Sequence, residues 1–407
     1  MIYLLIFLVL LFCIYYFDYA KHSHLFSFTY WGVFVVLVLV AGLRYRIGND
    51  SIVYENDYEA FPKIWELFSY NFSSTRYEPG FIVFSSIPRS FSSDFTWLQF
   101  FEAAVVNFVI FWFILKNTSN RFFCLTLYFV VLYLYFTTEI MREAIAVSIF
   151  LLSWPFFRDG KWLKYYLLAA LATFFHTSAF FLLVLPIFWL PGVRYFFRFG
   201  YRTIFVCIGI FAVAMVIQLK FYDYVQMLAL TQRMADRAHI YAKSELGGKL
   251  LNFWGMGDTF LRYALYAVLA LWLYKSKNKA RHIEGKDKMR AEKMEFMVLW
   301  QVYVTIIGMV LFIALRYTNY FSMFAFILMS QAYLKPIDIK DKVYRLRPMY
   351  WNLVFLPFFL ASFNFYLRPV NKAKTLPYYT KYYPYKHRLD PEKDSQREAI
   401  FRYYGTR

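Results

Sequence analysis

The stretch TWLQFFEAAVVNFVIFWFIL, residues 96–115, contains one charged residue, Glu102, in an otherwise apolar run. A helix needs about 20 consecutive, mainly apolar residues to cross the hydrocarbon core of a bilayer. The stretch therefore predicts a membrane-spanning helix. It is not isolated, because hydrophobic residues make up 60% of the 407 positions and charged residues only 17%. This composition excludes a soluble enzyme, a disulfide scaffold, a disordered chain and a single-span anchor.

Outward from this stretch the chain continues in similar apolar blocks. The predicted fold class is an all-α polytopic membrane protein with about 12 transmembrane helices. Residues 1–367 form one transmembrane domain in this prediction, and residues 368–407 form a basic, tyrosine-rich C-terminal tail. The predicted spans are 2–17, 28–43, 96–115, 122–138, 142–157, 163–175, 177–190, 203–219, 259–274, 296–315, 317–334 and 349–367.

The distribution of Lys and Arg predicts which side of the membrane each loop faces. The net charge is +19, which in a multi-span protein indicates basic cytoplasmic loops and anionic lipid rather than nucleic acid. The segment 275–293 carries eight Lys and Arg, so we predict a basic cytoplasmic loop there. The loops 44–95 and 220–258 then face outward, as do both termini. Two features weigh against this orientation: the ten Lys and Arg of the tail, and the alternative that 163–190 is one long tilted helix.

The two outer loops are predicted to hold structure of their own. In the first, apolar residues recur at helical spacing from Tyr54 to Phe68, which predicts an amphipathic helix along the interface. The run Glu55, Asp57 and Glu59 could hold a divalent cation, but such spacing is common on a solvated helix face. We therefore expect no metal and no other cofactor.

Arginines and carboxylates gather at the predicted outer ends of the spans. A charge in or near hydrocarbon costs several kcal/mol, so it usually has a partner or a function. Each arginine alone could extend to the lipid interface, whereas several around one cavity would suit a lipid-linked pyrophosphate, because guanidinium groups match phosphate oxygens. The arginines are Arg44, Arg46, Arg142, Arg262 and Arg316, and the carboxylates are Asp50, Glu78, Glu139, Glu143 and Asp258.

His176 lies between apolar residues in FFHTSAFF, beside a predicted helix break. It is either a hydrogen-bonded structural residue or a general base, since imidazole titrates near neutral pH.

Five segments together resemble the EpsG-like, Wzy-type polysaccharide polymerases. They occur in the order of the family pattern between about residues 42 and 321, and the last 40 residues match nothing. The segments are GLRYRIGNDSIVY (42–54), YEPGF (77–81), MREAIAVSIF (141–150), FFHTSAFF (174–181) and LRYTNYF (315–321).

The resemblance implies a GT-C-like glycosyltransferase in the bacterial inner membrane, with its active site facing the periplasm or exterior. It would polymerise undecaprenyl-pyrophosphate-linked oligosaccharides, which serve as donor and acceptor, for O-antigen, capsule or exopolysaccharide. Membrane lipid and a chain-length regulator are further partners, and nucleic acid is not.

The residue types then predict the roles. Arg142, supported by Arg46 and Arg316, would stabilise the departing pyrophosphate. His176 is the first candidate base, with Glu139 or Glu143 as the second. The predicted catalytic residues are thus Arg142, His176, Glu139 and Glu143, and the predicted substrate-binding residues are Arg44, Arg46, Asp50, Glu78, Arg262, Arg316 and Tyr320.

Three other functions remain open. An O-antigen ligase would use the same donor, and a flippase would move the same lipid-linked oligosaccharide without forming a bond. A membrane O-acyltransferase would also use one histidine, but it would need a cytoplasmic acyl-CoA route. No internal repeat of the kind found in transporters is seen in the sequence.

Overall fold

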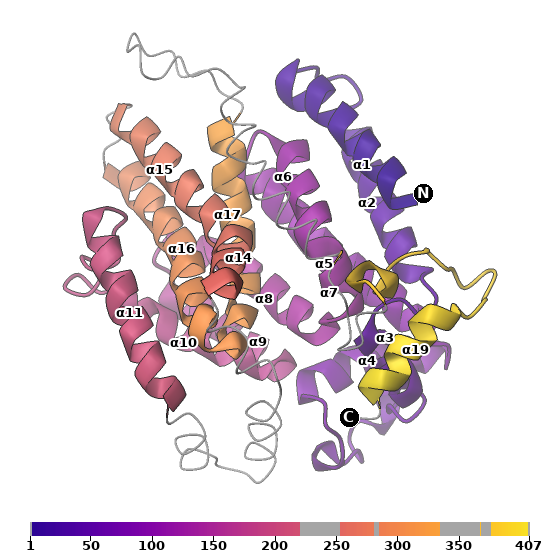
Figure 1. Ribbon diagram of the computed structural model, residues 1–407. Coiled ribbons are helices and arrows are strands. Elements are labelled where there is room, and N and C mark those ends of the chain that lie inside the picture. Colours follow the sequence, from indigo (N-terminus) through magenta and orange to yellow (C-terminus); the bar gives the residue numbers. More distant parts are fainter. Residues whose placement is uncertain (1, 220–252, 281–284, 334–366, 368–375, 406–407) are drawn as a thin grey trace. The chain divides into compact units, whose positions relative to one another are not determined.

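The computed structural model describes residues 2–219, 253–280, 285–333, 367 and 376–405. Within that part, the secondary structure is helical apart from two isolated β-bridges (Figure 1). The chain divides into two compact units, which are described separately. Unit 1 comprises residues 1–184 and 363–407, and unit 2 comprises residues 185–362.

Apolar helices dominate both units. Four are long and apolar enough to cross a membrane: Ile2–Tyr19, Phe95–Asn117, Arg121–Thr138 and Gly285–Val310. Shorter apolar helices are Phe26–Gly42, Trp162–Phe175, Thr177–Trp189, Tyr201–Ile217 and Leu265–Lys275. These helices indicate a multi-pass membrane protein.

In unit 1, the helices expected to span the membrane pack around α5 (Phe95–Asn117). Both α2 (Phe26–Gly42) and α8 (Met141–Arg158) lie against α5, and α9 (Trp162–Phe175) lies against α8. One polar pair inside this bundle is formed by two of its helices: the Tyr128 hydroxyl donates to Asn107 Oδ1 over 2.9 Å. Such pairing is expected where hydrocarbon offers no alternative hydrogen-bond partner.

The remaining N-terminal segments of unit 1 complete the bundle. The α-helix α1 (Ile2–Cys13) continues as the π-helix η1 (Ile14–Tyr19). The span Arg121–Thr138 consists of α6 (Arg121–Tyr128), the π-helix η4 (Phe129–Tyr133) and α7 (Leu134–Thr138). Beyond α9 follow η5 (Thr177–Phe180) and α10 (Phe181–Val184).

The loop 44–95 is structured, as predicted, but its helices differ from the prediction. The helix α3 (Asn49–Tyr58) ends well before Phe68, and only the short 3₁₀ turns η2 (Ile64–Glu66) and η3 (Phe72–Ser74) follow. Pro62 explains the early end, because proline disfavours helical backbone at the residue before it and lacks an N–H. A second helix, α4 (Pro79–Phe91), was not predicted; Pro79 stands in its first turn, a position that tolerates proline.

Unit 2 begins at η6 (Leu185–Trp189) and contains α11 (Tyr201–Leu219), α14 (Phe253–Tyr263), α15 (Leu265–Ala280), α16 (Gly285–Val310), η7 (Phe312–Tyr317) and α17 (Thr318–Tyr333). The predicted span 259–274 therefore contains a boundary between two helices. The predicted basic loop 275–293 is largely helical where it is described, because α15 and α16 both extend into it. The predicted span 349–367, apart from residue 367, and most of the loop 220–258 lie outside the described residues.

The C-terminal tail belongs to unit 1. It contains the 3₁₀ turn η9 (Tyr378–Lys381) and the helix α19 (Ser395–Gly405). In Figure 1, α19 lies beside α3 of the loop 44–95, and the contacts between the two helices agree. The sequence did not predict this association.

Candidate functional site

Arg142 lies in the first turn of α8 and is held by two residues of the loop 44–95. Its Nη1 lies 2.5 Å from Glu78 Oε2, and its Nε donates to the Tyr54 hydroxyl over 3.1 Å. The guanidinium also lies over the Tyr77 ring, 5.2 Å from its centroid, in cation–π contact. Its Nη2 makes no hydrogen bond among the described residues, so its N–H groups are available as donors.

The residues around Arg142 are themselves fixed. The Tyr77 hydroxyl donates to Asp57 Oδ2 over 2.6 Å, and Arg76 forms an ion pair with the same carboxylate. Burial raises the pKa of Tyr54 to about 12, although the nearby Arg142 acts in the opposite direction. The Tyr54 hydroxyl therefore stays neutral near pH 7 and accepts the bond from Arg142.

His176 and Glu143 face each other. His176 caps η5, where the Ser178 N–H donates to its Nδ1 over 3.2 Å and the Ser178 hydroxyl lies 2.6 Å from the same atom. With Nδ1 as the acceptor, the proton of a neutral ring is on Nε2. That nitrogen lies 3.9 Å from Glu143 Oε2. Both side chains are buried, at 9% and 1% exposure.

A glycine brings the Arg142 partners and the histidine segment together. Gly80 follows Glu78 in YEPGF, and a Cβ there would lie 2.7 Å from Phe174 O, closer than real contacts allow. Only glycine lets the start of α4 approach the end of α9 this closely. Phe174 is two residues before His176, and Glu143 is adjacent to Arg142. One end of the unit 1 bundle thus holds an arginine, two carboxylates and a histidine.

The other predicted residues of unit 1 lie around this end, with protein partners of their own. Arg44 is 2% exposed and donates to Ala41 O, and it lies 3.7 Å from Met141 Sδ. Glu139 Oε1 lies 3.3 Å from the hydroxyl of Tyr382 and 3.9 Å from Lys381 Nζ.

Two further predicted residues lie at the start of the loop 44–95. Arg46 is bound by the C-terminal tail: its Nε and Nη2 contact the two carboxylate oxygens of Glu398. Asp50 is exposed in the first turn of α3, where a negative charge complements the helix dipole.

The three remaining predicted residues are in unit 2. Arg262 pairs with Asp258 one turn earlier in α14, with Nη2 2.7 Å from Oδ2. Arg316 is half-buried in η7, and Tyr320 is 1% exposed in α17. The structure thus brings together the predicted residues of unit 1, and Arg262, Arg316 and Tyr320 remain a separate prediction.

The acidic run 55–59 does not form a shared ligand set. Glu55 contacts Arg46 and Arg388, whereas Asp57 contacts Arg76 and Tyr77. Across the described residues, no group of three or more His, Cys, Asp or Glu side chains is placed to hold a metal ion.

Sequence reasoning missed several residues of this end of the bundle. Tyr54 closes the motif GLRYRIGNDSIVY, so its signal was present, yet its role as a partner of Arg142 was not predicted. Tyr77 precedes Glu78 in YEPGF in the same way. The tail residues Lys381, Arg388 and Glu398 carried no signal, because nothing in the sequence says which segment a basic tail contacts.

Comparison with known proteins assigns the chain to a family. The model of the EpsG family matches residues 27–387. No match was found among curated proteins or among solved structures. The matched region contains all eleven predicted site residues and ends within the C-terminal tail, before Arg388 and Glu398. The chain is therefore a helical membrane protein of the EpsG family, which is linked to exopolysaccharide biosynthesis.

Proposed function

We propose that the protein is a Wzy-type polysaccharide polymerase. It transfers a growing glycan from undecaprenyl pyrophosphate to the terminal sugar of a second lipid-linked repeat unit. Membership of the EpsG family supports this reaction class. In this proposal the chain crosses the bacterial inner membrane about 12 times, and the end of unit 1 that carries Arg142 faces outward.

The observation that carries the proposal is the arrangement of Arg142, Glu143, His176 and Glu78 at the start of α8. The cation is fixed by Glu78 and Tyr54, with one nitrogen left for a ligand. The Glu143–His176 pair stands beside it in the chain. A fixed arginine can stabilise the departing pyrophosphate oxygen, and a neighbouring acid–base pair can take the proton of the attacking hydroxyl.

In the proposed step, a hydroxyl oxygen of the acceptor sugar attacks the anomeric carbon of the donor. The bond between that carbon and the pyrophosphate oxygen breaks, and the oxygen leaves with the electron pair. Negative charge grows on this oxygen in the transition state, so Arg142 Nη2 stabilises the transition state more than the bound substrate. The N-terminus of α8, where no side-chain cap bonds the backbone, favours the same charge.

The proton of the attacking hydroxyl goes to the Glu143–His176 pair. Because His176 accepts from the Ser178 N–H at Nδ1, its Nε2 is the protonated nitrogen, and it faces Glu143 Oε2 at 3.9 Å, beyond hydrogen-bond distance. The carboxylate is therefore the better proton acceptor, and the N–H of His176 that faces it favours its negative charge. This reverses the order of preference expected from the sequence, in which the imidazole was the first candidate base.

A deletion strain tests the proposal against its alternatives. Cells lacking this chain should accumulate lipid-linked single repeat units on the outer face of the inner membrane. A flippase would instead leave the same units on the cytoplasmic face. A ligase would leave full-length glycan on its lipid carrier, and either outcome would overturn the polymerase assignment.

A further inference from the structure

The C-terminal tail returns to the start of the loop 44–95 and pairs with it through the backbone. The Tyr45 N–H donates to Lys386 O over 2.9 Å, and the Arg388 N–H donates to Leu43 O over 2.8 Å. These two bonds frame an antiparallel bridge between Arg44 and His387. Because these bonds need direct contact, residues 376–405 must lie on the same side of the membrane as the loop.

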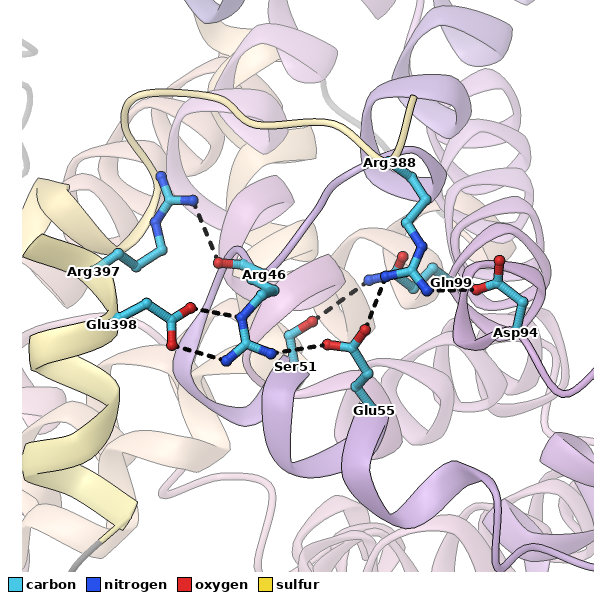
Figure 2. A network of polar contacts seen from close by, with 8 residues as sticks. All are labelled: Arg46, Ser51, Glu55, Asp94, Gln99, Arg388, Arg397 and Glu398. Atoms are coloured by element: carbon cyan, nitrogen blue, oxygen red, sulfur yellow. Dashed lines mark hydrogen bonds and ion pairs between the residues drawn. The ribbon is translucent and has the colours of Figure 1, made fainter. Parts of the chain in front are cut away.

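Charged side chains reinforce this pairing. Glu398 takes the guanidinium of Arg46 in a two-bond fork, with distances of 2.6 and 2.9 Å (Figure 2). Arg46 Nη1 also lies 3.5 Å from Glu55 Oε2, and Arg388 lies between Glu55 and Asp94 at 3.0 and 3.2 Å. Two-bond pairs of this kind are stronger and more directional than single contacts. The hydrogen bonds that Arg46 donates to the Glu398 carboxylate raise the pKa of Arg46.

The inner side of the tail is buried. Arg397 is 1% exposed and donates to the carbonyl oxygens of Thr380, Arg46 and Pro384. Burial lowers the pKa of Arg397, so this cation is held at a cost that only a well-fixed backbone offsets. Ile400 on α19 is 2% exposed. The segment is therefore packed as part of the fold and does not merely rest on its surface.

The tail also reaches the candidate site. Lys381 and Tyr382 contact Glu139, three residues before Arg142, and the Gly48 N–H donates to Lys381 O over 3.2 Å. The tail thus holds the turn between α7 and α8 from one side, while Gly48 packs against Thr138 from the loop.

We propose that residues 376–405, here called the clasp, dock on the loop 44–95 and position the turn between α7 and α8 that contains Glu139. Arg46 is the residue of the loop that binds the clasp. Arg46 was expected to bind pyrophosphate, but three of its nitrogens already face carboxylates. Glu398 is then a positioning residue that acts through Arg46 and the Glu139 turn. This inference rests on the proposed function for its effect on the reaction, whereas the docking of the tail is independent of it.

Charge exchange separates the two possible roles of Arg46. Glu398→Arg places two cations together and should release the tail, as should Arg46→Glu. In the double variant the carboxylate introduced at position 46 faces the guanidinium introduced at position 398, so the fork is restored in reverse. A ligand-binding role for Arg46 is not restored by this exchange, because the site then carries a carboxylate. Asp390→Arg makes the same charge change at an exposed tail position and is the matched control.

Two readouts are needed. The first is the rate at which Ile400→Cys reacts with a maleimide in purified protein, measured in the wild-type, single and double charge backgrounds. The second is kcat and KM for elongation of lipid-linked repeat units extracted from cells lacking this chain. We expect each single exchange to speed labelling at least tenfold and to lower kcat about tenfold or more with little change in KM. The double variant should recover the wild-type labelling rate and the wild-type kcat, and Asp390→Arg should change neither quantity.

Two results would overturn the proposal. Equal labelling in the wild-type and Glu398→Arg backgrounds would show that the tail is not docked. Recovered protection without recovered kcat in the double variant would show that Arg46 acts on the ligand. If the wild-type protein elongates nothing, the proposed function fails, and labelling that follows the charge exchange still supports the clasp.

Discussion

Arg142 Nη1 lies 2.5 Å from Glu78 Oε2, although the two residues are 64 positions apart in the chain. Their side chains are 22% and 10% exposed, so water screens the pair only in part. Removing one partner of such a pair costs more than the pair itself contributes, since the other charge is left without compensation. The contact joins the start of α4 to the start of α8, and the site depends on that junction.

The first prediction concerns this pair. Glu78→Ala and Arg142→Ala should each destabilise the protein, and the double variant should be destabilised less than their sum. A coupling of about 0.5–3 kcal/mol is typical of side chains in direct contact. Unfolding in detergent, followed by the exposure of buried cysteines, measures it. Additive effects would show that the two side chains do not interact.

The second prediction concerns the chemistry at Arg142. Arg142→Lys keeps the positive charge but loses the planar fork that reaches Glu78 and Tyr54 together. Elongation should fall about 100-fold, in line with the loss of one oriented donor in a transition state, while the protein still inserts. Arg158→Lys at the other end of α8 is the control, because Arg158 forms an ion pair with its neighbour in the sequence, Asp159, far along the helix from Arg142. Similar losses in both variants would contradict a special role for Arg142.

The third prediction separates structure from chemistry at His176. Asparagine can cap η5 as His176 does, because its side-chain oxygen accepts from the Ser178 N–H. His176→Asn should therefore preserve stability and still lower kcat by about 100-fold, because Glu143, the proposed base, loses the imidazole N–H that faces it. His176→Ala should lower both the stability and kcat. Normal chain lengths in the asparagine variant would remove His176 from the mechanism.

The fourth prediction concerns Gly48. Its φ is +87°, and a Cβ there would lie 2.6 Å from Thr138 Cβ. Gly48→Ala should displace the turn before Glu139 and lower both stability and elongation. Gly160→Ala is the control, because Gly160 also has positive φ (+73°) but open space around it. At position 160, alanine should lower the free energy of unfolding only by the cost of its positive φ, about 1–2 kcal/mol. Equal effects would mean that contact with Thr138 is unimportant.

The fifth prediction concerns topology. Leu389→Cys in the tail should react with a membrane-impermeant maleimide in spheroplasts, because Leu389 is 79% exposed and the tail shares the side of the loop 44–95. Lys288→Cys, in the basic segment predicted to be cytoplasmic, should react only in inverted vesicles. The reverse pattern would invert the proposed orientation.

The sequence predicted the class of the fold and several of its helices well. The stretch 96–115 agrees with α5, and 28–43 with α2, because mainly apolar runs of this length have few alternatives to a buried helix. The helix expected from Tyr54 to Phe68 was wrong, since the aromatic spacing continued past Pro62 but the backbone could not. The amphipathic pattern showed which faces are buried, and the proline showed where the helix ends.

The sequence named candidate residues for the site, but it did not predict which of them contact each other. Arg142, Glu78, Glu143 and His176 lie at one end of unit 1, and their role in a reaction stays a prediction. The partners of Arg46 and Glu139 could not be predicted, because both come from the tail, 352 and 243 positions away. Contacts at such separations depend on the path of the whole chain, which local patterns do not encode.

The most direct test of the central claim is elongation by the purified protein in liposomes. The substrate is lipid-linked single repeat units extracted from cells lacking this chain, supplied without any other acceptor, and the products are resolved by size. A ladder of longer lipid-linked glycans that disappears with Arg142→Lys and persists with Arg158→Lys is the predicted result. Single units that remain unchanged, or a ladder that does not depend on Arg142, would contradict the account.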